Sequence, residues 1–317
     1  MRFTQTDSRR ANSPDSFSDQ VPTFFQATEF FIQHARIHGR SRKTIEMYEW
    51  VFERVYKYLG KNPLLNALDT VTLRHYFSYL IERSYKPASL SMHYRVLHAF
   101  FVWCVREHLV AATPLDGIPK PKMPKIFPFM LDDHQVTALV KACDKSTKHG
   151  CRNHAILLLF LDCGLRLNEL INVHLNDVSL PNRSLKVHGK GAKDRIVYMG
   201  ARATKALRRW LELRSFRPGY DENLFIDRKG ESLKRRWVQL IIVRLGYRAG
   251  LGMRLSPHKL RHISATLAVK HGMDTFTLQR LYGWENVQTA MRYVNAASPA
   301  LREAHAKASP VDRLLEG

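Results

Sequence analysis

Apolar residues recur at helical spacing in the first part of the chain, between about Thr23 and Glu107. Stripes with this spacing predict helices, because they place apolar side chains on one helix face. The stripes are Phe24, Thr28, Phe31 and Ala35; Ile45, Tyr48, Phe52, Val55 and Leu59; Leu73, Tyr76, Phe77 and Leu80; and Leu90, Tyr94, Leu97, Phe101 and Val105. Asp69 and Thr70 are candidate caps for the third helix. We therefore expect a bundle of four helices within residues 23–112.

A proline-rich stretch follows this helical part. The sequence TPLDGIPKPKMPKIFP, residues 113–128, has proline at positions 114, 119, 121, 124 and 128. Proline fixes φ and lacks an N–H group, so we expect an extended, basic interdomain linker. Residues 1–22 are polar and lack the apolar segment of a signal peptide, and we expect them to be disordered.

The pattern changes within the expected second domain, residues 129–308. DDHQVTALVKAC predicts a helix entered at Asp132, CRNHAILLLFLDCG a buried helix ending at Gly164, and LRLNELINVHLNDV a further helical stretch. RSLKVHGKGAKDRIVYM then alternates apolar and polar residues around glycines, which predicts a β-hairpin. Helices resume from about Ala203. The fold class expected is mainly α with a small β-sheet insert, an α+β arrangement.

Charge narrows the class of partner. The chain of 317 residues has 50 Lys and Arg against 28 Asp and Glu, a formal net charge of +22. Such an excess favours a polyanion, and nucleic acid is favoured over a membrane because the most apolar run, HAILLLFLDCGL, is too short to cross a bilayer. We expect a cytoplasmic protein. Its cysteines form no C-x-x-C pair, so we expect reduced thiols: Cys104, Cys143, Cys151 and Cys163.

Candidate DNA contacts in the helical domain lie at two helix starts. RIHGRSRKT supplies Arg40, Arg42 and Lys43, where cations and backbone N–H groups could contact phosphate; an ordinary solvated loop is the alternative. The polar side of the fourth helix could lie in a groove, and its candidate residues are Ser89, Ser91, His93 and Arg95.

The second domain has polar residues that do not fit a simple surface. Arg166 lies in a Gly-Leu-Arg turn between two apolar helices, and the hairpin tip carries Lys190, flanked by glycines, and Lys193, a further candidate DNA contact. In LSPHKLRHISAT, His258 and Arg261 share one face of a helix that begins after a proline. Two aromatic candidates follow in LYGWENVQT and TAMRYVN, Trp284 and Tyr293.

A metal site is the first alternative for the HKLRH stretch. His258 and His262 have the spacing of a helical zinc pair, but a lysine stands where a zinc protease has glutamate, and Arg261 would repel a cation. No neighbouring carboxylate or cysteine completes a ligand set in the sequence, so we expect no metal. A solvated charged face is disfavoured because ISATLAVKHG continues an apolar helix. A phosphate site is left as the best interpretation.

The motifs CGLRLNEL, HGKGAKDR, PHKLRH and YGWENVQTAMRYV occur in an order and spacing that resemble the tyrosine recombinase, or phage-type integrase, family in its Xer-like, core-only form. The resemblance extends from Thr23 to about Leu315. It implies a core-binding domain (a SAM-like helical bundle), a catalytic domain and no cofactor. Carried over by motif, the catalytic residues are Arg166, Lys190, His258, Arg261, Trp284 and the nucleophile Tyr293. Many members have histidine where this chain has Trp284, and an indole cannot transfer a proton.

The resemblance also implies a reaction and an assembly. Tyr293 would attack a DNA phosphodiester to give a 3′-phosphotyrosine, with the arginines binding the phosphate and Lys190 acting as the acid. His258 would accept the tyrosine proton or donate a hydrogen bond to the phosphate. The enzyme would act on an inverted-repeat core site as a dimer, and as a tetramer in the synapse. Residues 309–317 predict a short C-terminal helix that docks on its own domain or on a neighbouring protomer. A type IB topoisomerase-like monomer and a non-catalytic DNA-binding regulator are the alternatives. The target sequence, and the choice between integration, excision and resolution, stay open.

Overall fold

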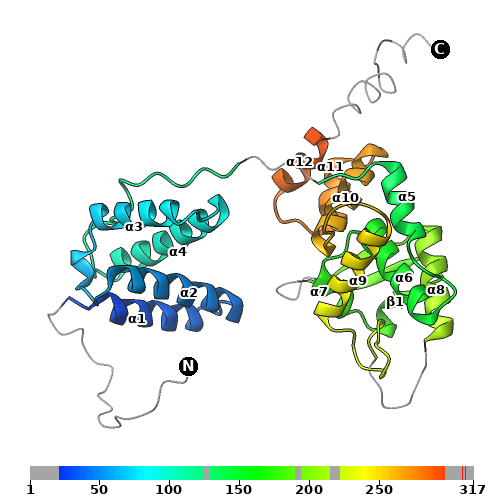
Figure 1. Ribbon diagram of the computed structural model, residues 1–317, viewed down its shortest axis with the longest axis horizontal. Helices are drawn as coiled ribbons and strands as arrows, with labels where there is room; N and C mark the ends of the chain where they lie inside the picture. The colour runs from blue at the N-terminus through cyan, green and yellow to red at the C-terminus, as the bar shows by residue number, and fades with distance from the viewer. Residues whose placement is uncertain are drawn as a thin grey trace. The chain divides into compact units, whose positions relative to one another are not determined.

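The computed structural model describes residues 21–124, 129–189, 194–214 and 222–296, together with Ser309 and Val311. The chain divides into two compact units, Met1–Lys125 and Ile126–Gly317, each with its own hydrophobic core. Their boundary lies inside the stretch expected to be a linker. The labelled elements of each unit can be followed in Figure 1.

The first unit contains the helices expected from the four stripes: α1(Phe24–Ile37), α2(Arg42–Leu59), α3(Thr70–Glu82) and α4(Pro87–Arg106), with a 3-10 turn at Leu65–Ala67. Asp69 caps α3 by accepting a hydrogen bond from the Thr72 backbone N–H, as the sequence predicted. Edge-to-face aromatic rings fill the core, including Phe24 on Phe100 with centroids 5.8 Å apart. Such pairs fix geometry as well as bury area.

The linker begins later than the sequence indicated. Leu115 and Ile118 are buried in the core of the first unit, and residues 114–117 form a turn. The prolines of this stretch exclude a helix, but they do not prevent apolar residues between them from packing. The expected start of an extended linker at Thr113 is therefore wrong, and residues 119–124 are the part without regular structure.

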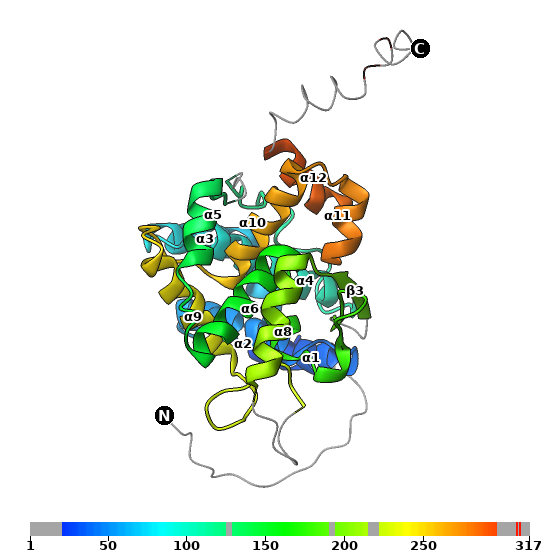
Figure 2. The same cartoon turned by 90° about the vertical axis from the view of Figure 1, so that its right-hand side faces the viewer.

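The second unit is mostly helical. Its helices are α5(Asp133–Lys141), α6(Lys148–Cys163), α7(Leu167–Ile171), α8(Ala201–Leu213), α9(Arg235–Arg248), α10(Pro257–Lys270), α11(Thr275–Tyr282) and α12(Val287–Ala296). The helical stretch expected from LRLNELINVHLNDV is present only in part, because α7 has five residues and a separate 3-10 turn, Leu175–Asp177, follows it. Figures 1 and 2 both show α10, α11 and α12 side by side.

The hairpin expected from alternation is present. An antiparallel sheet of order β1-β2-β3 contains β1(Val178–Ser179), β2(Ser184–His188) and β3(Asp194–Tyr198), and β1 was not foreseen. Leu185 and Val197 are register partners and both are fully buried. The hairpin tip with Lys190 and Lys193 lies outside the described residues. The expected fold class, mainly α with a small β insert, is confirmed.

The packing of the second unit places one end of α6 beside the C-terminal helices. Helix α6 is buried along Ala155–Leu157 and packs against α8 and α10. A smaller apolar cluster joins α10, α11 and α12, and includes Tyr282 and Tyr293. Within the described residues, no helix combines the length and apolarity needed to cross a membrane.

Candidate active site

The turn after α6 requires glycine at position 164 for two reasons. Gly164 has φ +58°, a left-handed conformation that other residues adopt at a cost. A Cβ added there would lie 2.3 Å from Cε1 of Tyr282. The turn leads to Arg166, the N-cap of α7, whose backbone N–H donates to Glu169 over 2.7 Å. The Arg166 guanidinium donates to Glu169 at 2.8 Å and to the carbonyl oxygen of Gly283 at 2.8 Å.

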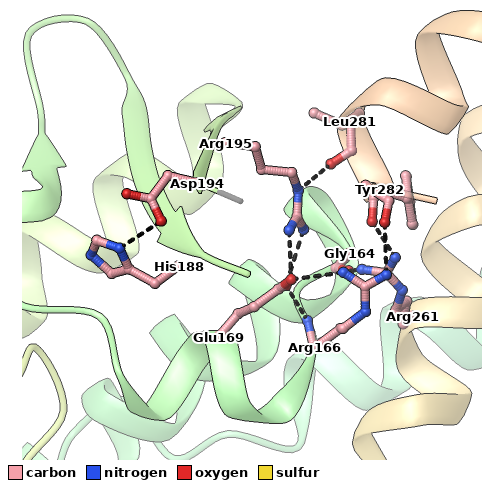
Figure 3. Close-up of polar contacts among 10 residues, drawn as sticks. Gly164, Arg166, Glu169, His188, Asp194, Arg195, Arg261, Leu281 and Tyr282 are labelled. Carbon is pink, nitrogen blue, oxygen red and sulfur yellow. Dashed lines mark hydrogen bonds and ion pairs between the residues drawn. The ribbon is translucent and has the colours of Figure 1, made fainter. Parts of the chain in front are cut away.

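Glu169 joins two arginines at the centre of this site, as Figure 3 shows. Its side chain is only 3% exposed, and it accepts hydrogen bonds from both Arg166 and Arg195. Arg195, on β3, also donates to the carbonyl oxygen of Leu281 over 2.9 Å. Burial alone would raise the pKa of Glu169, but the hydrogen bonds and charge of Arg195, with the hydrogen bonds of Arg166, hold that pKa below its ordinary value. The carboxylate is thus ionised and fixes both arginines.

Arg261 is held by main-chain oxygens. It lies in the first half of α10, which Ser256 caps by accepting from the Lys259 N–H. The guanidinium, in a residue 4% exposed, donates to the carbonyl oxygens of Gly164 and Tyr282 (Figure 3). Burial and the nearby Arg166 charge lower the pKa of Arg261 to about 10, so it stays charged at neutral pH. Because these contacts use only part of its N–H donors, others can bind a phosphate oxygen.

A chain of hydrogen bonds leads away from the hydroxyl of Tyr293. Nδ1 of His262 is hydrogen-bonded to the Tyr293 hydroxyl, and its Nε2 lies 3.1 Å from Nε2 of His258. When the Tyr293 hydroxyl donates to Nδ1 of His262, the neutral His262 ring carries its own N–H at Nε2 and donates it to His258. Tyr293, His262 and His258 then all take part in complementary hydrogen bonds. Trp284 stacks on the Tyr293 ring, with centroids 5.2 Å apart and planes 5° from parallel.

The surroundings of this hydrogen-bonded series favour the neutral forms of His262 and His258. Burial, His258 and Arg261 lower the pKa of His262 to about 4. Burial and the charges of Arg261 and Arg166 also lower the pKa of His258. Burial raises the pKa of Tyr293, against the opposing charges of Arg261 and Arg292. A neutral His262 can accept the tyrosine proton, and the resulting tyrosinate would lie near the positive charge of Arg261.

The structure brings together five of the residues expected at this site: Arg166, His258, Arg261, Trp284 and Tyr293. Glu169, Arg195 and the link between His262 and Tyr293 were missed. The sequence signals of Glu169 and Arg195 were an acidic residue three positions after Arg166 and an arginine just after the hairpin tip. Lys190 and Lys193 lie outside the described residues.

The expected DNA contacts of the first unit divide into two groups. Arg40, Arg42, Lys43 and Arg95 are exposed, and Ser89 is half-exposed. Ser91 is 7% exposed and His93 is fully buried, with its Nδ1 2.8 Å from the Tyr76 hydroxyl. The structure contradicts direct DNA contact for these two residues, because both side chains face the core of the bundle.

These features define a class: an enzyme site with paired arginines for an anionic group and a tyrosine whose hydroxyl contacts a neutral histidine. The family model described as the phage integrase family matches residues 130–299. The tyrosine recombinase XerD of Pseudomonas putida is 34% identical over 240 residues, which cover 74% of this chain and 80% of the relative. XerC of Staphylococcus saprophyticus is 28% identical over 274 residues, 85% of this chain and 92% of the relative. The chain therefore belongs to the phage integrase family of tyrosine recombinases, and it is a site-specific DNA recombinase.

Solved structures share the fold. One is the XerH site-specific recombinase bound to palindromic difH substrate, with a TM-score of 0.73, 22% identity, and coverage of 88% of this chain and 83% of that one. Another is a lambda integrase dimer bound to a COC′ core site, with a TM-score of 0.70, 18% identity, and coverage of 84% and 97%.

Proposed function

We propose that this recombinase cuts and rejoins DNA through a covalent bond between Tyr293 and a DNA 3′-phosphate. The Tyr293 oxygen attacks phosphorus, the bond to the 5′-oxygen breaks, and that oxygen leaves with a proton as a free 5′-hydroxyl. The observation that carries the proposal is the contact of the Tyr293 hydroxyl with His262, a neutral base, beside Arg261. A second strand's 5′-hydroxyl reverses the step, so rejoining needs no nucleotide cofactor.

The arginines bind the phosphate in this proposal. Arg166 and Arg261 stabilise charge on its non-bridging oxygens, and Glu169 with the Gly164 and Tyr282 carbonyls fixes their orientation beforehand. A preorganised donor of this kind contributes about 3 kcal/mol to the transition state. Trp284 packs on the tyrosine ring and gives it a fixed plane.

The proton of Tyr293 passes to His262 in our proposal, and His258 accepts from the other side of that ring. This places His258 second in the relay, whereas the resemblance left two roles open for it, accepting the tyrosine proton or donating a hydrogen bond to the phosphate. Lys190 is the acid that protonates the leaving 5′-oxygen. This role is supported by the place of Lys190 in the sequence between β2 and β3. Strand β3 lies beside the phosphate site, because its Arg195 donates to the Glu169 carboxylate.

Tyr293→Phe tests the nucleophile, because the ring and its stacking on Trp284 survive while the attacking oxygen is lost. We expect no covalent protein–DNA adduct on a nicked suicide substrate, with DNA binding in gel shifts nearly unchanged. A covalent adduct formed by the variant would refute the assignment.

We further propose that the enzyme binds an inverted-repeat core site as a dimer, pairs two sites as a tetramer, and acts in the cytoplasm. The exposed Arg40, Arg42, Lys43 and Arg95 would contact the DNA backbone. Val311 is 62% exposed on the single protomer, which supports docking of residues 309–317 on a neighbour. Truncation after Ala308 should leave half-site binding intact and weaken cooperative binding to a full site. Unchanged cooperativity, with a less stable monomer, would favour docking within one protomer.

A further inference from the structure

His188 lies between two carboxylates at the base of the hairpin. It is the last residue of β2 and the register partner of Asp194, the first residue of β3. Its Nδ1 is 2.9 Å from Oδ1 of Asp194, and its Nε2 is 3.3 Å from Oδ1 of Asp177, which ends the 3-10 turn after α7. Figure 3 shows the His188–Asp194 contact. One imidazole thus links both hairpin strands to the turn beside them.

The groups around this imidazole favour its charged form. Asp177 is 11% exposed and accepts the backbone N–H of His174 at 2.8 Å, so its carboxylate cannot easily turn away. The ring of His174 lies 3.6 Å from Asp177, and Lys186 lies 3.2 Å from Asp194. Both nitrogens of a protonated His188 donate, whereas a neutral ring turns one lone pair toward a carboxylate. The hydrogen bond to Asp194, with the charge of Asp177, raises the pKa of His188 against a smaller effect of burial.

The hairpin is fixed to the active site by a second contact on the neighbouring residue. Arg195 follows Asp194 directly, and its guanidinium reaches Glu169, the partner of Arg166. The arginine therefore fixes β3 toward the phosphate site, while His188 fixes the strand that leads into the tip. In the sequence, Lys190 is two residues beyond His188.

We propose that His188, held between Asp177 and Asp194, is a positioning residue that fixes the base of the hairpin so that Lys190 reaches the leaving 5′-oxygen. The inference rests on the proposed role of Lys190 as general acid. Charged His188 donates to both Asp177 and Asp194, whereas neutral His188 donates to only one of them. Proton transfer from Lys190 to the leaving 5′-oxygen should therefore weaken as pH rises through the raised pKa of His188.

A divalent cation is the alternative occupant. His174, Asp177 and His188 each place a ligand atom within 4.8 Å of the others. One observation favours the proton: both nitrogens of His188 are already hydrogen-bonded to carboxylates. A metal would have to break these contacts.

The test measures single-turnover cleavage of two suicide substrates, one with the normal 5′-oxygen and one with a 5′-sulfur at the scissile bond. Sulfur leaves as a stable thiolate and needs no acid. His188→Ala should slow cleavage of the oxygen substrate by about tenfold or more, since general acids contribute 10²–10⁴-fold, and should leave the sulfur substrate near the wild-type rate. His174→Ala is the matched control, because it contacts the same aspartate without linking the hairpin, and it should alter neither rate.

The pH profile gives a second readout. For the wild type, the oxygen-to-sulfur rate ratio should fall as pH rises above the ordinary histidine pKa, and His188→Gln, which keeps an amide donor without a charge, should lack this step. Equal slowing of both substrates by His188→Ala would overturn the positioning role in favour of a purely structural one. If EDTA abolished cleavage by the wild type and added zinc restored it, a metal ion bound by His188 would replace the protonated imidazole as the group that fixes the hairpin.

Lys190→Ala separates the failure of this inference from the failure of the proposed function. If sulfur rescues Lys190→Ala but not His188→Ala, the acid role of Lys190 stands and the role of His188 falls. If sulfur rescues neither variant, the acid role of Lys190 is wrong and the inference built on it falls as well. Melting temperatures of all variants identify any that unfold, and His188→Gln then carries the test.

Discussion

Gly164→Ala should damage both stability and catalysis, because this position has no room for a methyl group. The added Cβ would meet Cε1 and Cζ of Tyr282 at 2.3 and 2.6 Å, while φ stays at +58°. Tyr282 is fully buried, so its ring has no solvent into which to retreat. The matched control is Gly250→Ala, at φ +70° with nothing within 4 Å of the added Cβ.

The difference between the two variants isolates the ring contact. Each should lose about 1–2 kcal/mol of unfolding free energy, because a left-handed conformation disfavours any Cβ. Gly164→Ala should lose about 1–3 kcal/mol more, the usual cost of overpacking a core, for a total of about 2–5 kcal/mol. Urea unfolding of the full chain measures both variants under the same conditions.

The same contact extends to the chemistry. Arg261 donates to the carbonyl oxygens of both Gly164 and Tyr282, so displacing either residue moves the guanidinium. Gly164→Ala should therefore form the covalent DNA adduct more slowly than Gly250→Ala under conditions where both are folded. Equal losses of stability, or equal adduct rates, would refute the argument that the ring contact positions Arg261.

Three further predictions follow from the charges. Arg166→Lys should slow adduct formation about 10²-fold or more, since an ammonium cannot replace a planar fork, with little change in gel-shift affinity; near-normal cleavage would remove Arg166 from the site. Glu169→Gln should lose about 3–5 kcal/mol in urea unfolding, because Arg166 and Arg195 lose a buried charge partner, and a loss below about 1 kcal/mol would contradict this. Burial lowers the pKa of His93 in the folded protein from 6.5 to about 4, and the charge of Arg54 has a smaller effect in the same direction. As pH drops, the unfolded chain therefore binds a proton at His93 before the folded protein does, so stability falls from pH 6.5 towards pH 4. His93→Gln should flatten this dependence in melting curves; an unchanged slope would show that other groups cause it.

The sequence predicted helices well where one apolar stripe decides the structure. The presence and order of α1 to α4 and the entry of α5 at Asp132 follow from spacing and capping residues alone. LRLNELINVHLNDV was misread because its apolar residues continue at near-helical intervals after α7 ends. Backbone bonds of Leu175 to Glu222 and of Leu224 to Val173 instead tie this part of the chain to a distant segment. Periodicity within a window carries no information about such partners.

The polar side of α4 shows a second limit. Ser91 and His93 look like surface residues by type, and both are buried. His93 is tolerated inside because the Tyr76 hydroxyl satisfies one ring nitrogen, and the ring also lies 5.2 Å from that of Trp50. The partner that makes burial possible is seventeen residues away, so residue type predicts the wrong face.

The active site was predictable to the extent that its residues lie in short motifs, and the contacts that orient them were not. Arg166, Arg261 and Tyr293 could be selected because they lie in motifs that resemble those of the tyrosine recombinase family. What fixes them is long-range: Arg261 to Gly164, Arg195 to Glu169, and Tyr293 to His262. Glu169 illustrates the reason. A lone glutamate in a helix predicts a solvated face, and only the fold brings two arginines to it and keeps it ionised in the interior. The chemistry therefore depends on residues whose own sequence signal is weak, and variants of Glu169 and Arg195 test the site as directly as variants of the residues that contact the phosphate.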